Sequence, residues 1–416
     1  MSSLPDRTAL PRNDAADRRG LWLALVLSLG AAVSLGVTRF AYGLLLPPMR
    51  EDLAWSYTLA GAMNTVNALG YLLGALSTPW LMRRFGPGEL LHGGAALASV
   101  FMAGSGFFVD AGPLMVQRLL AGVASAWVFI AGGLLAARLG AHWPKRSGLL
   151  LGLYYGGTGW GIVASAVMVP WVLHAMAARP HAWAWAWWWL AGLCALATAA
   201  LVWVVRALQR HDTGLTCAAT PSPATDGAGD SASPALWRLA PALAGYSLFG
   251  VGYIGYMTFV IALLRDQGLS GGAITAFYSL LGLAVVASSR IWAGLLDRHK
   301  DGQPLARLNA LLGVATVLPA LTAAWPVLLL SGVLFGGVFL SVVASTTALV
   351  RHNLPASRWA AGISAFTIVF AAGQIVGPTV VGLIADGPGG LERGLLFSAV
   401  ALWVGAGFAW RQKALA

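Results

Sequence analysis

Long apolar stretches separated by short polar segments dominate the chain. Twelve of them reach the roughly 20 residues that a helix needs to cross about 30 Å of hydrocarbon. They are 21–46, 55–81, 89–109, 114–137, 147–175, 183–206, 239–264, 271–296, 305–324, 326–350, 359–385 and 391–411. The stretches lack the alternation of strands, and a helix satisfies its own backbone groups in lipid. The pattern therefore predicts an all-α membrane protein of twelve transmembrane helices.

The polar segments divide the chain into two halves. The longest, 207–237, is rich in Ala, Ser, Thr, Pro and Gly, a composition typical of a flexible linker. It separates an N-terminal six-helix bundle, 21–206, from a C-terminal one, 238–411, with polar tails at 1–20 and 412–416. Because the first apolar stretch far exceeds the about 7–15 residues of a signal-peptide core, we interpret it as a retained span.

Composition and charge support a membrane location. Apolar residues make up 58% of the chain and charged residues 10%, whereas a soluble protein carries about 25% charged residues. The net charge of +11 raises the possibility of nucleic-acid binding. If the N-terminus is cytoplasmic, however, 19 of the 26 Lys and Arg residues lie in cytoplasmic segments, 4 lie on the other side and 3 lie within spans. The positive-inside rule then predicts a bacterial inner-membrane protein with both termini cytoplasmic, and no nucleic-acid partner.

A single constant shift along the sequence aligns the two halves without gaps. The shift pairs Gly36 with Gly250, Tyr42 with Tyr256, Arg84 with Arg298, Gly122 with Gly336, and Gly159 with Gly373. Because one register holds from the first span of a half to the fifth, we expect two pseudo-symmetric six-helix bundles related by an axis along the membrane normal. In transporters built from such repeats, the substrate site lies near the midplane between the halves.

Arg39 is the most informative charged residue within a span. It lies in the second half of the first span, too deep to reach water easily, and Tyr42 shares its helix face. A charge in the bilayer core costs at least about 2.5–3.5 kcal/mol, so it usually serves a function. Since a guanidinium forks onto a carboxylate, we expect Arg39 and Tyr42 to bind an anionic or strongly polar substrate group. The alternative is a structural arginine bonded to backbone carbonyls or to a neighbouring helix.

A polar stripe marks the second span. Asn64, Asn67 and Tyr71 fall on one face of an otherwise apolar helix, so this face meets protein or a cavity rather than lipid. We take Asn64 and Asn67 as substrate-binding candidates, with hydrogen bonding between helices as the alternative. Arg118 in the fourth span is a further candidate; alternatively, its side chain snorkels to the outer interface beside Asp110.

Aromatic and amide side chains recur at other mid-span positions. Tyr154, Tyr253, Tyr256 and Gln374 are the members that we expect at the substrate site. Several phenols near the midplane favour a polar, aromatic pocket, because each buried hydroxyl needs a partner. The alternative for an aromatic residue at helical spacing is core packing.

Several kinds of chemistry lack a sequence signal. All 15 acidic residues fall in tails, loops or span ends, so the sequence does not indicate proton coupling through a buried carboxylate. The phosphate-binding pattern G-x-x-x-x-G-K-[ST] is absent, as are a nucleophile–base set and a histidine cluster. We therefore expect a protein that is not an enzyme and has no cofactor or metal. Its expected partners are a small-molecule substrate, the lipid bilayer and a coupling ion of unknown identity, with a functional monomer.

Two loops carry a family motif. "RIWAGLLDRHKDG" at 290–302 resembles the loop motif of the major facilitator superfamily, and "PWLMRRFGPG" at 79–88 resembles its first-half copy, with a basic residue at the position of the family aspartate. In the superfamily, the motif closes the cytoplasmic side of the outward-facing state through charge contacts. The resemblance implies this gating role for Arg84, Asp297 and Arg298.

The first two spans narrow the resemblance. "TRFAYGLLLPPM" at 38–49 and "NALGYLLGAL" at 67–76 are similar to the YbfB/YjiJ-type branch. The superfamily resemblance covers essentially the whole chain and implies a secondary active transporter that moves a small organic solute by alternating access. We expect an anionic or zwitterionic metabolite. The alternatives are a multidrug or toxic-compound exporter and, more remotely, a membrane sensor or scaffold that transports nothing.

Overall fold

The computed structural model describes residues 12–143, 146–212, 237–355 and 358–415, and their regular structure is entirely helical. The N-terminal half contains α1 (Arg12–Ala31), the π-helix η1 (Ala32–Val37), α2 (Tyr42–Asp52), α3 (Tyr57–Ser105), α4 (Ala111–Ala141), α5 (Ser147–Ala175) and α6 (Ala182–Asp212). The C-terminal half contains α8 (Ala240–Asp266), α9 (Gly271–Ile291), α10 (Ala293–Arg298), α11 (Gln303–Leu321), α12 (Trp325–Asn353), α13 (Trp359–Ala385) and α14 (Gly390–Trp410).

The number of spans agrees with the sequence prediction. Within the described residues, 11 helical segments are long and apolar enough to cross a membrane. One of them is α3, whose 49 residues are interrupted at Gly86 by a backbone with φ 82° and ψ 161° that glycine adopts without steric cost. Its two arms cover the second and third expected spans. Counting the arms separately confirms twelve transmembrane helices, whereas most of the expected linker, 213–236, lies outside the described residues.

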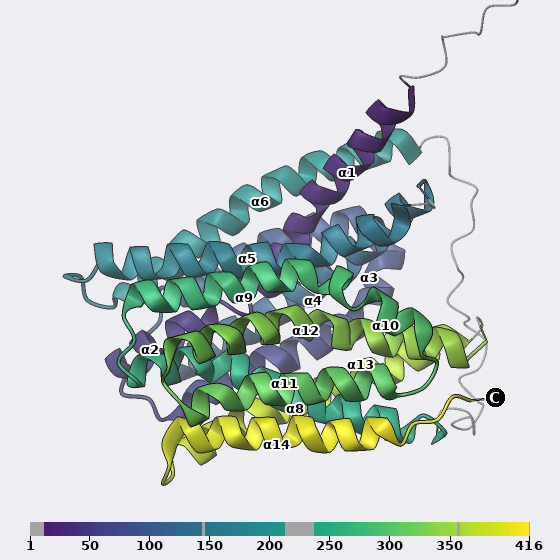
Figure 1. The fold of residues 1–416 in the computed structure, drawn as a ribbon. Helices are drawn as coiled ribbons and strands as arrows, with labels where there is room; N and C mark the ends of the chain where they lie inside the picture. Colours follow the sequence, from purple (N-terminus) through teal and green to yellow (C-terminus); the bar gives the residue numbers. More distant parts are fainter. Residues whose placement is uncertain (1–11, 144–145, 213–236, 356–357, 416) are drawn as a thin grey trace, which may run out of the picture.

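The helices run side by side, with α1–α6 forming one half of the bundle and α8–α14 the other (Figure 1). The start of α1 and the C-terminal residues lie at the same end of the bundle, which we call the termini end. The opposite end, where α2 leads into α3, is called the far end. This arrangement agrees with the even number of crossings predicted from the sequence.

The two halves repeat each other in their packing contacts. A Cβ atom added to Gly122 would lie 2.2 Å from the carbonyl oxygen of Asn67, and one added to Gly336 would lie 2.2 Å from that of Leu281. The shift that aligns the halves in the sequence carries both members of the first pair onto those of the second. Small residues at these positions allow the helix backbones to touch. The pseudo-symmetry thus extends to this individual helix contact.

The first span differs from the continuous helix that the sequence suggested. It consists of α1, η1, a turn over 38–41, and α2. The carbonyl of Val33 accepts hydrogen bonds from both the backbone N–H (3.0 Å) and the hydroxyl (2.6 Å) of Thr38, beside the turn. Irregular backbone at membrane depth is tolerated where protein groups satisfy it, and π-helical segments occur frequently at functional sites. Arg39 lies in this turn.

Candidate functional site

A cavity of about 390 Å³ separates the two halves on the termini-end side of Arg39. Helices of both halves line it, each with the part nearer the termini end. The lining residues are Leu35, Arg39, Phe40, Tyr71, Ala75, Phe129, Ile130, Gly133, Leu134, Tyr155, Tyr246, Tyr253, Phe339, Leu340, Val343, Thr346, Thr347, Ile363, Phe366, Thr367 and Phe370. Its size suits a small organic molecule.

Arg39 supplies the charge of this cavity. Its side chain is 3% exposed, it donates to Oε1 of Gln374, and its guanidinium lies 5.5 Å from the centroid of the Tyr71 ring. No other charged side chain appears among the described lining residues, and no acidic group within the described part of the chain forms an ion pair with Arg39. A guanidinium has five N–H donors, so Arg39 keeps donors available to a ligand.

Gln374 joins the halves at this point. Its Oε1 accepts hydrogen bonds from Arg39 of the N-terminal half and from the hydroxyl of Tyr253 (3.0 Å) on α8 of the C-terminal half. Gln374 itself is on α13 and is 2% exposed. Three of the residues expected at the substrate site therefore meet in one hydrogen-bonded cluster at the cavity.

Arg118 is buried to the same extent as Arg39 but lies outside the cavity lining. It donates to the carbonyl of Thr38 (2.8 Å) and to Oδ1 of Asn64 (2.9 Å), and its guanidinium lies 4.8 Å from the ring centroid of Tyr42. It therefore satisfies a carbonyl that the turn beside Arg39 leaves free. The side chain of Arg118 therefore does not extend to the outer interface, which was the alternative considered from the sequence. Instead, it stabilises the turn.

The asparagine stripe of α3 makes bonds between helices. Asn67 donates to the carbonyl of Arg118 (2.9 Å), while Asn64 donates to the hydroxyl of Thr258 (2.7 Å) across the two halves. Neither asparagine lines the cavity. Tyr71, the third member of the stripe, does line it, so the stripe continues from an interhelical contact into the cavity wall.

The other expected site tyrosines bond to neighbouring helices. Tyr42 donates to the carbonyl of Ala60 (2.8 Å), and Tyr154 donates to that of Phe129 (2.8 Å). Tyr256 shares a hydrogen bond with Ser331 (2.8 Å). None of the three tyrosines lines the cavity. A substrate role for them remains a prediction, and the contacts describe packing within each half.

Sequence reasoning missed several aromatic residues of the cavity wall. Tyr246, Phe339 and Phe370 line the cavity although we did not place them at the site. The heptad spacing of Tyr246 and Tyr253 on α8 was a usable signal, because such residues share a helix face. Nothing in the sequence distinguished Phe339 or Phe370 from the other apolar residues of α12 and α13.

Polar contacts between the halves close the far end. Asp386 at the end of α13 accepts hydrogen bonds from the backbone N–H groups of Tyr57 (2.7 Å) and Thr58 (2.8 Å) and from the Thr58 hydroxyl (2.6 Å). The Tyr57 hydroxyl donates to Asp266 (2.9 Å), and the Arg50 guanidinium lies 3.9 Å from the Tyr57 ring centroid. These bonds hold the two halves together at the far end.

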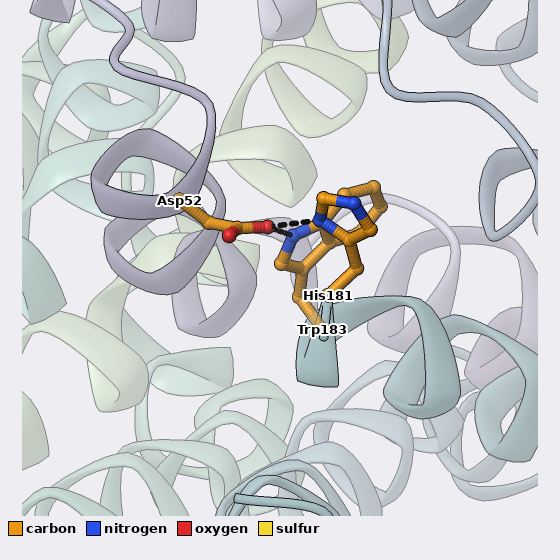
Figure 2. A network of polar contacts seen from close by, with 3 residues as sticks. All are labelled: Asp52, His181 and Trp183. Carbon is orange, nitrogen blue, oxygen red and sulfur yellow. Dashed lines mark hydrogen bonds and ion pairs between the residues drawn. The ribbon is translucent and has the colours of Figure 1, made fainter. Parts of the chain in front are cut away.

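A second polar contact at the far end lies within the N-terminal half. One carboxylate oxygen of Asp52, the last residue of α2, bonds Nδ1 of His181 and the indole N–H of Trp183, both at 2.5 Å (Figure 2). His181 precedes α6 with φ 53°, a left-handed conformation that is uncommon for a residue other than glycine. These bonds fasten the α5–α6 connection to the end of α2.

Comparisons with known proteins agree with this architecture. The family model of the uncharacterised MFS-type transporter YbfB matches residues 31–409. The chain belongs to this family of major facilitator transporters. No curated protein sequence matches the chain.

Two solved transporters share the major facilitator fold. A bacterial homologue of the human lysosomal transporter Spinster, in an inward-facing and occupied conformation, is 15% identical with a TM-score of 0.63, covering 95% of this chain and 96% of that one. The E. coli fucose:proton symporter FucP is also 15% identical, with a TM-score of 0.59 and coverage of 94% and 97%. Likeness at this identity concerns the fold alone.

The loop motif of the major facilitator family lies exposed at the termini end. Arg84 is near the rings of Trp80 (5.8 Å) and Phe85 (5.6 Å). Within the described residues, Arg84, Asp297 and Arg298 make no ion pair. The gating role of these three residues stays a prediction.

Proposed function

We propose that this major facilitator transporter moves a small organic anion or zwitterion across the bacterial inner membrane by alternating access, with Arg39 as the main substrate anchor. The observation that supports this most strongly is the charge balance of the cavity. Arg39 is the charged member of its described lining and has no acidic partner there. A buried guanidinium without a counter-charge is costly, and an anionic substrate group would neutralise its charge and accept its hydrogen bonds.

The bonds between the halves at the far end and the cavity on the termini-end side together support a carrier with one gate closed. With both termini in the cytoplasm, as the distribution of Lys and Arg predicts, this shape is an inward-facing state. Alternating access would then close the termini end, where Arg84, Asp297 and Arg298 lie, and open the contacts around Asp386.

Uptake into proteoliposomes tests this function. Purified protein is screened against a panel of small carboxylates, amino acids, sugars and amines, first by thermal shift and then by transport. We expect a carboxylate or zwitterion to be moved, and Arg39→Ala to weaken its binding at least about tenfold. Unchanged affinity in Arg39→Ala would overturn the anchor, as would transport restricted to neutral or cationic solutes.

The aromatic lining favours a second candidate, the export of toxic compounds. Nine of the described lining residues are Phe or Tyr, which suits flat apolar molecules. A deletion strain would then be more sensitive to such a compound, and expression of the protein would restore resistance. Sensitivity confined to cationic drugs would contradict Arg39 as the anchor, because like charges repel.

A further inference from the structure

One wall of the cavity consists of nearly parallel aromatic rings from the C-terminal half. The Tyr253 ring lies 5.4 Å from Phe339 at an interplanar angle of 18°, and 5.5 Å from Phe370 at 19°. Phe370 in turn lies 4.9 Å from Tyr246 at 23°. Such rings favour offset stacking with another flat ring. The wall therefore has the shape and chemistry to receive a planar aromatic body.

The charges of the cavity limit the ligand further. Arg39 can neutralise one carboxylate, and no second cation lines the described part of the cavity, so a dianion would keep an uncompensated charge. An acidic side chain is also absent from this lining, so the ammonium group of a zwitterion would lack an ionic partner. The remaining polar lining groups are the neutral hydroxyls of tyrosines and threonines. This balance favours a monoanion.

Gln374 does not line the cavity itself, but its amide oxygen occupies the donors of two residues that do, Arg39 and Tyr253. Its Oε1 accepts from both Arg39 and Tyr253, and a carboxylate oxygen can accept from the same two donors. The bond from Arg39 to the amide already has an ionised donor, whereas a carboxylate adds an ionised acceptor and can receive two parallel bonds from the guanidinium. A carboxylate therefore competes favourably with the amide for Arg39.

Resting on the transport function proposed above, we propose that the substrate is an aromatic monocarboxylate and that its carboxylate displaces Gln374 from Arg39 and Tyr253. Its ring packs on the wall of Tyr253, Phe339 and Phe370. Because Arg39 and Gln374 belong to different halves, the exchange replaces a direct bond between the halves with one made through the ligand. Substrate binding thereby changes a contact that the halves must alter when they move.

Four probes of similar size test the ligand class with the purified full-length protein. Phenylacetate is the aromatic monoanion, cyclohexylacetate lacks the aromatic ring, phenylacetamide lacks the charge and phenethylamine reverses it. Binding is measured by isothermal titration and by thermal shift. We expect phenylacetate to bind at least about tenfold more tightly than each of the others. Equal binding of cyclohexylacetate would overturn the aromatic part of the inference, and failure of phenylacetate to bind would overturn the ligand class.

Two substitutions at Gln374 test the displacement. Gln374→Glu places a competing carboxylate beside Arg39, and we expect phenylacetate to bind about 10- to 100-fold more weakly. Gln374→Leu removes the competing acceptor at similar volume, and we expect unchanged or tighter binding. If Gln374 were only structural, the isosteric Glu variant would bind normally and the Leu variant would lose affinity, which would overturn the displacement.

Arg39→Gln separates this inference from the proposed function. We expect it to abolish phenylacetate binding, while Arg290→Gln, which changes an exposed arginine of α9 outside the cavity lining, leaves binding intact. Suppose that phenylacetate does not bind to the wild type, but Arg39→Gln weakens transport of another carboxylate. This result would support Arg39 as the substrate anchor and would contradict the aromatic ligand class. If Arg39→Gln changes nothing for any anion, the proposed function falls as well.

Discussion

Arg39 and Tyr253 occupy equivalent positions of the two halves, and both donate a hydrogen bond to Oε1 of Gln374. The pseudo-symmetry of the backbone therefore brings two different side chains to one acceptor. The N-terminal half contributes a cation and the C-terminal half a phenol. A ligand that binds here contacts both halves at once, which a carrier with rocking halves requires.

Tyr253→Phe should weaken substrate binding without unfolding the protein. The change removes one hydrogen bond at the cavity, for which we expect a loss of about 0.5–1.5 kcal/mol, or roughly 2- to 13-fold in affinity. Isothermal titration with the transported solute measures this effect. The ring remains, so stacking with Phe339 and Phe370 is preserved.

Tyr256→Phe is the matched control for Tyr253→Phe. Tyr256 lies one turn further along α8 and is equally buried, but its hydroxyl bonds Ser331 away from the cavity. Because Tyr256 does not line the cavity, we expect a lower melting temperature and unchanged affinity, a result that would argue against the substrate role predicted for Tyr256 from the sequence. Equal losses of affinity in the two variants would show that Tyr253 acts through general packing rather than through the cavity cluster.

Arg118→Met should destabilise the empty transporter. It leaves the carbonyl of Thr38 and the amide oxygen of Asn64 without their donor, and an unsatisfied buried group costs about 1–3 kcal/mol. Thermal unfolding without any ligand measures the change. If Arg118 instead served mainly as a substrate contact, the empty protein would unfold at the wild-type temperature and only the ligand-induced shift would disappear.

Tyr278→Phe tests the other support of the turn beside Arg39. The Tyr278 hydroxyl donates to the carbonyl of Phe40 (2.9 Å) from α9 of the opposite half. We expect a smaller loss of stability than in Arg118→Met, of about 1 kcal/mol, because a single neutral hydrogen bond is removed. Thermal unfolding of both variants under the same conditions shows which of them loses more stability. A larger loss in Tyr278→Phe would contradict the assignment of Arg118 as the main support.

The apolar pattern predicted the spans well, whereas the turn at 38–41 could not be predicted. A long run of apolar residues satisfies a simple length requirement, but the groups that stabilise the turn come from elsewhere. Arg118, which supports Thr38, lies on α4, and Tyr278, which supports Phe40, lies in the other half of the chain. No local sequence pattern predicts hydrogen-bond partners of the turn that lie so far away along the chain.

The position of Arg39 within the span predicted that it lies deep in the membrane, but the sequence did not predict its hydrogen-bond partner, Gln374. Gln374 appeared as a mid-span amide, and only the packing of α13 against the N-terminal half brings it to Arg39. The role of Asp386 was hidden for a related reason. In the sequence it is one of many acidic residues at span ends, and its bonds are to backbone groups of Tyr57 and Thr58 in the opposite half of the chain.

Asp386→Asn should favour opening of the far end. The carboxylate accepts three hydrogen bonds from the start of α3, and removing its charge weakens each of them. We expect the equilibrium to shift about tenfold towards the open far end. Spin labels at the exposed residues Ala178 and Gly272, introduced after replacement of the two native cysteines, report the distance between the halves there.

Glu392→Gln provides the control for Asp386→Asn. Glu392 is exposed near the start of α14, at the same end and in the same half, and has no ion pair with another described residue. The substitution removes the same charge, so we expect no change in the label distances. An equal shift in both variants would attribute the opening to net charge at the far end rather than to the bonds of Asp386.

The far-end contact should also have a defined pH dependence. Burial alone would raise the pKa of Asp386, but hydrogen bonds from Thr58 and Tyr57 and the charge of Arg50 outweigh it and hold this pKa below its ordinary value. The closed form therefore binds fewer protons at Asp386 than a form with the carboxyl group free in water. The stabilisation is complete above the ordinary pKa of about 3.9 and is lost as the pH falls through the lowered value.

Label distances measured across a pH series test this dependence. Wild-type label distances should stay constant from about pH 8 to pH 5 and lengthen only in stronger acid, while Asp386→Asn shows no acid step. A step near pH 6 in the wild type would contradict the assignment of this contact to the Asp386 carboxylate.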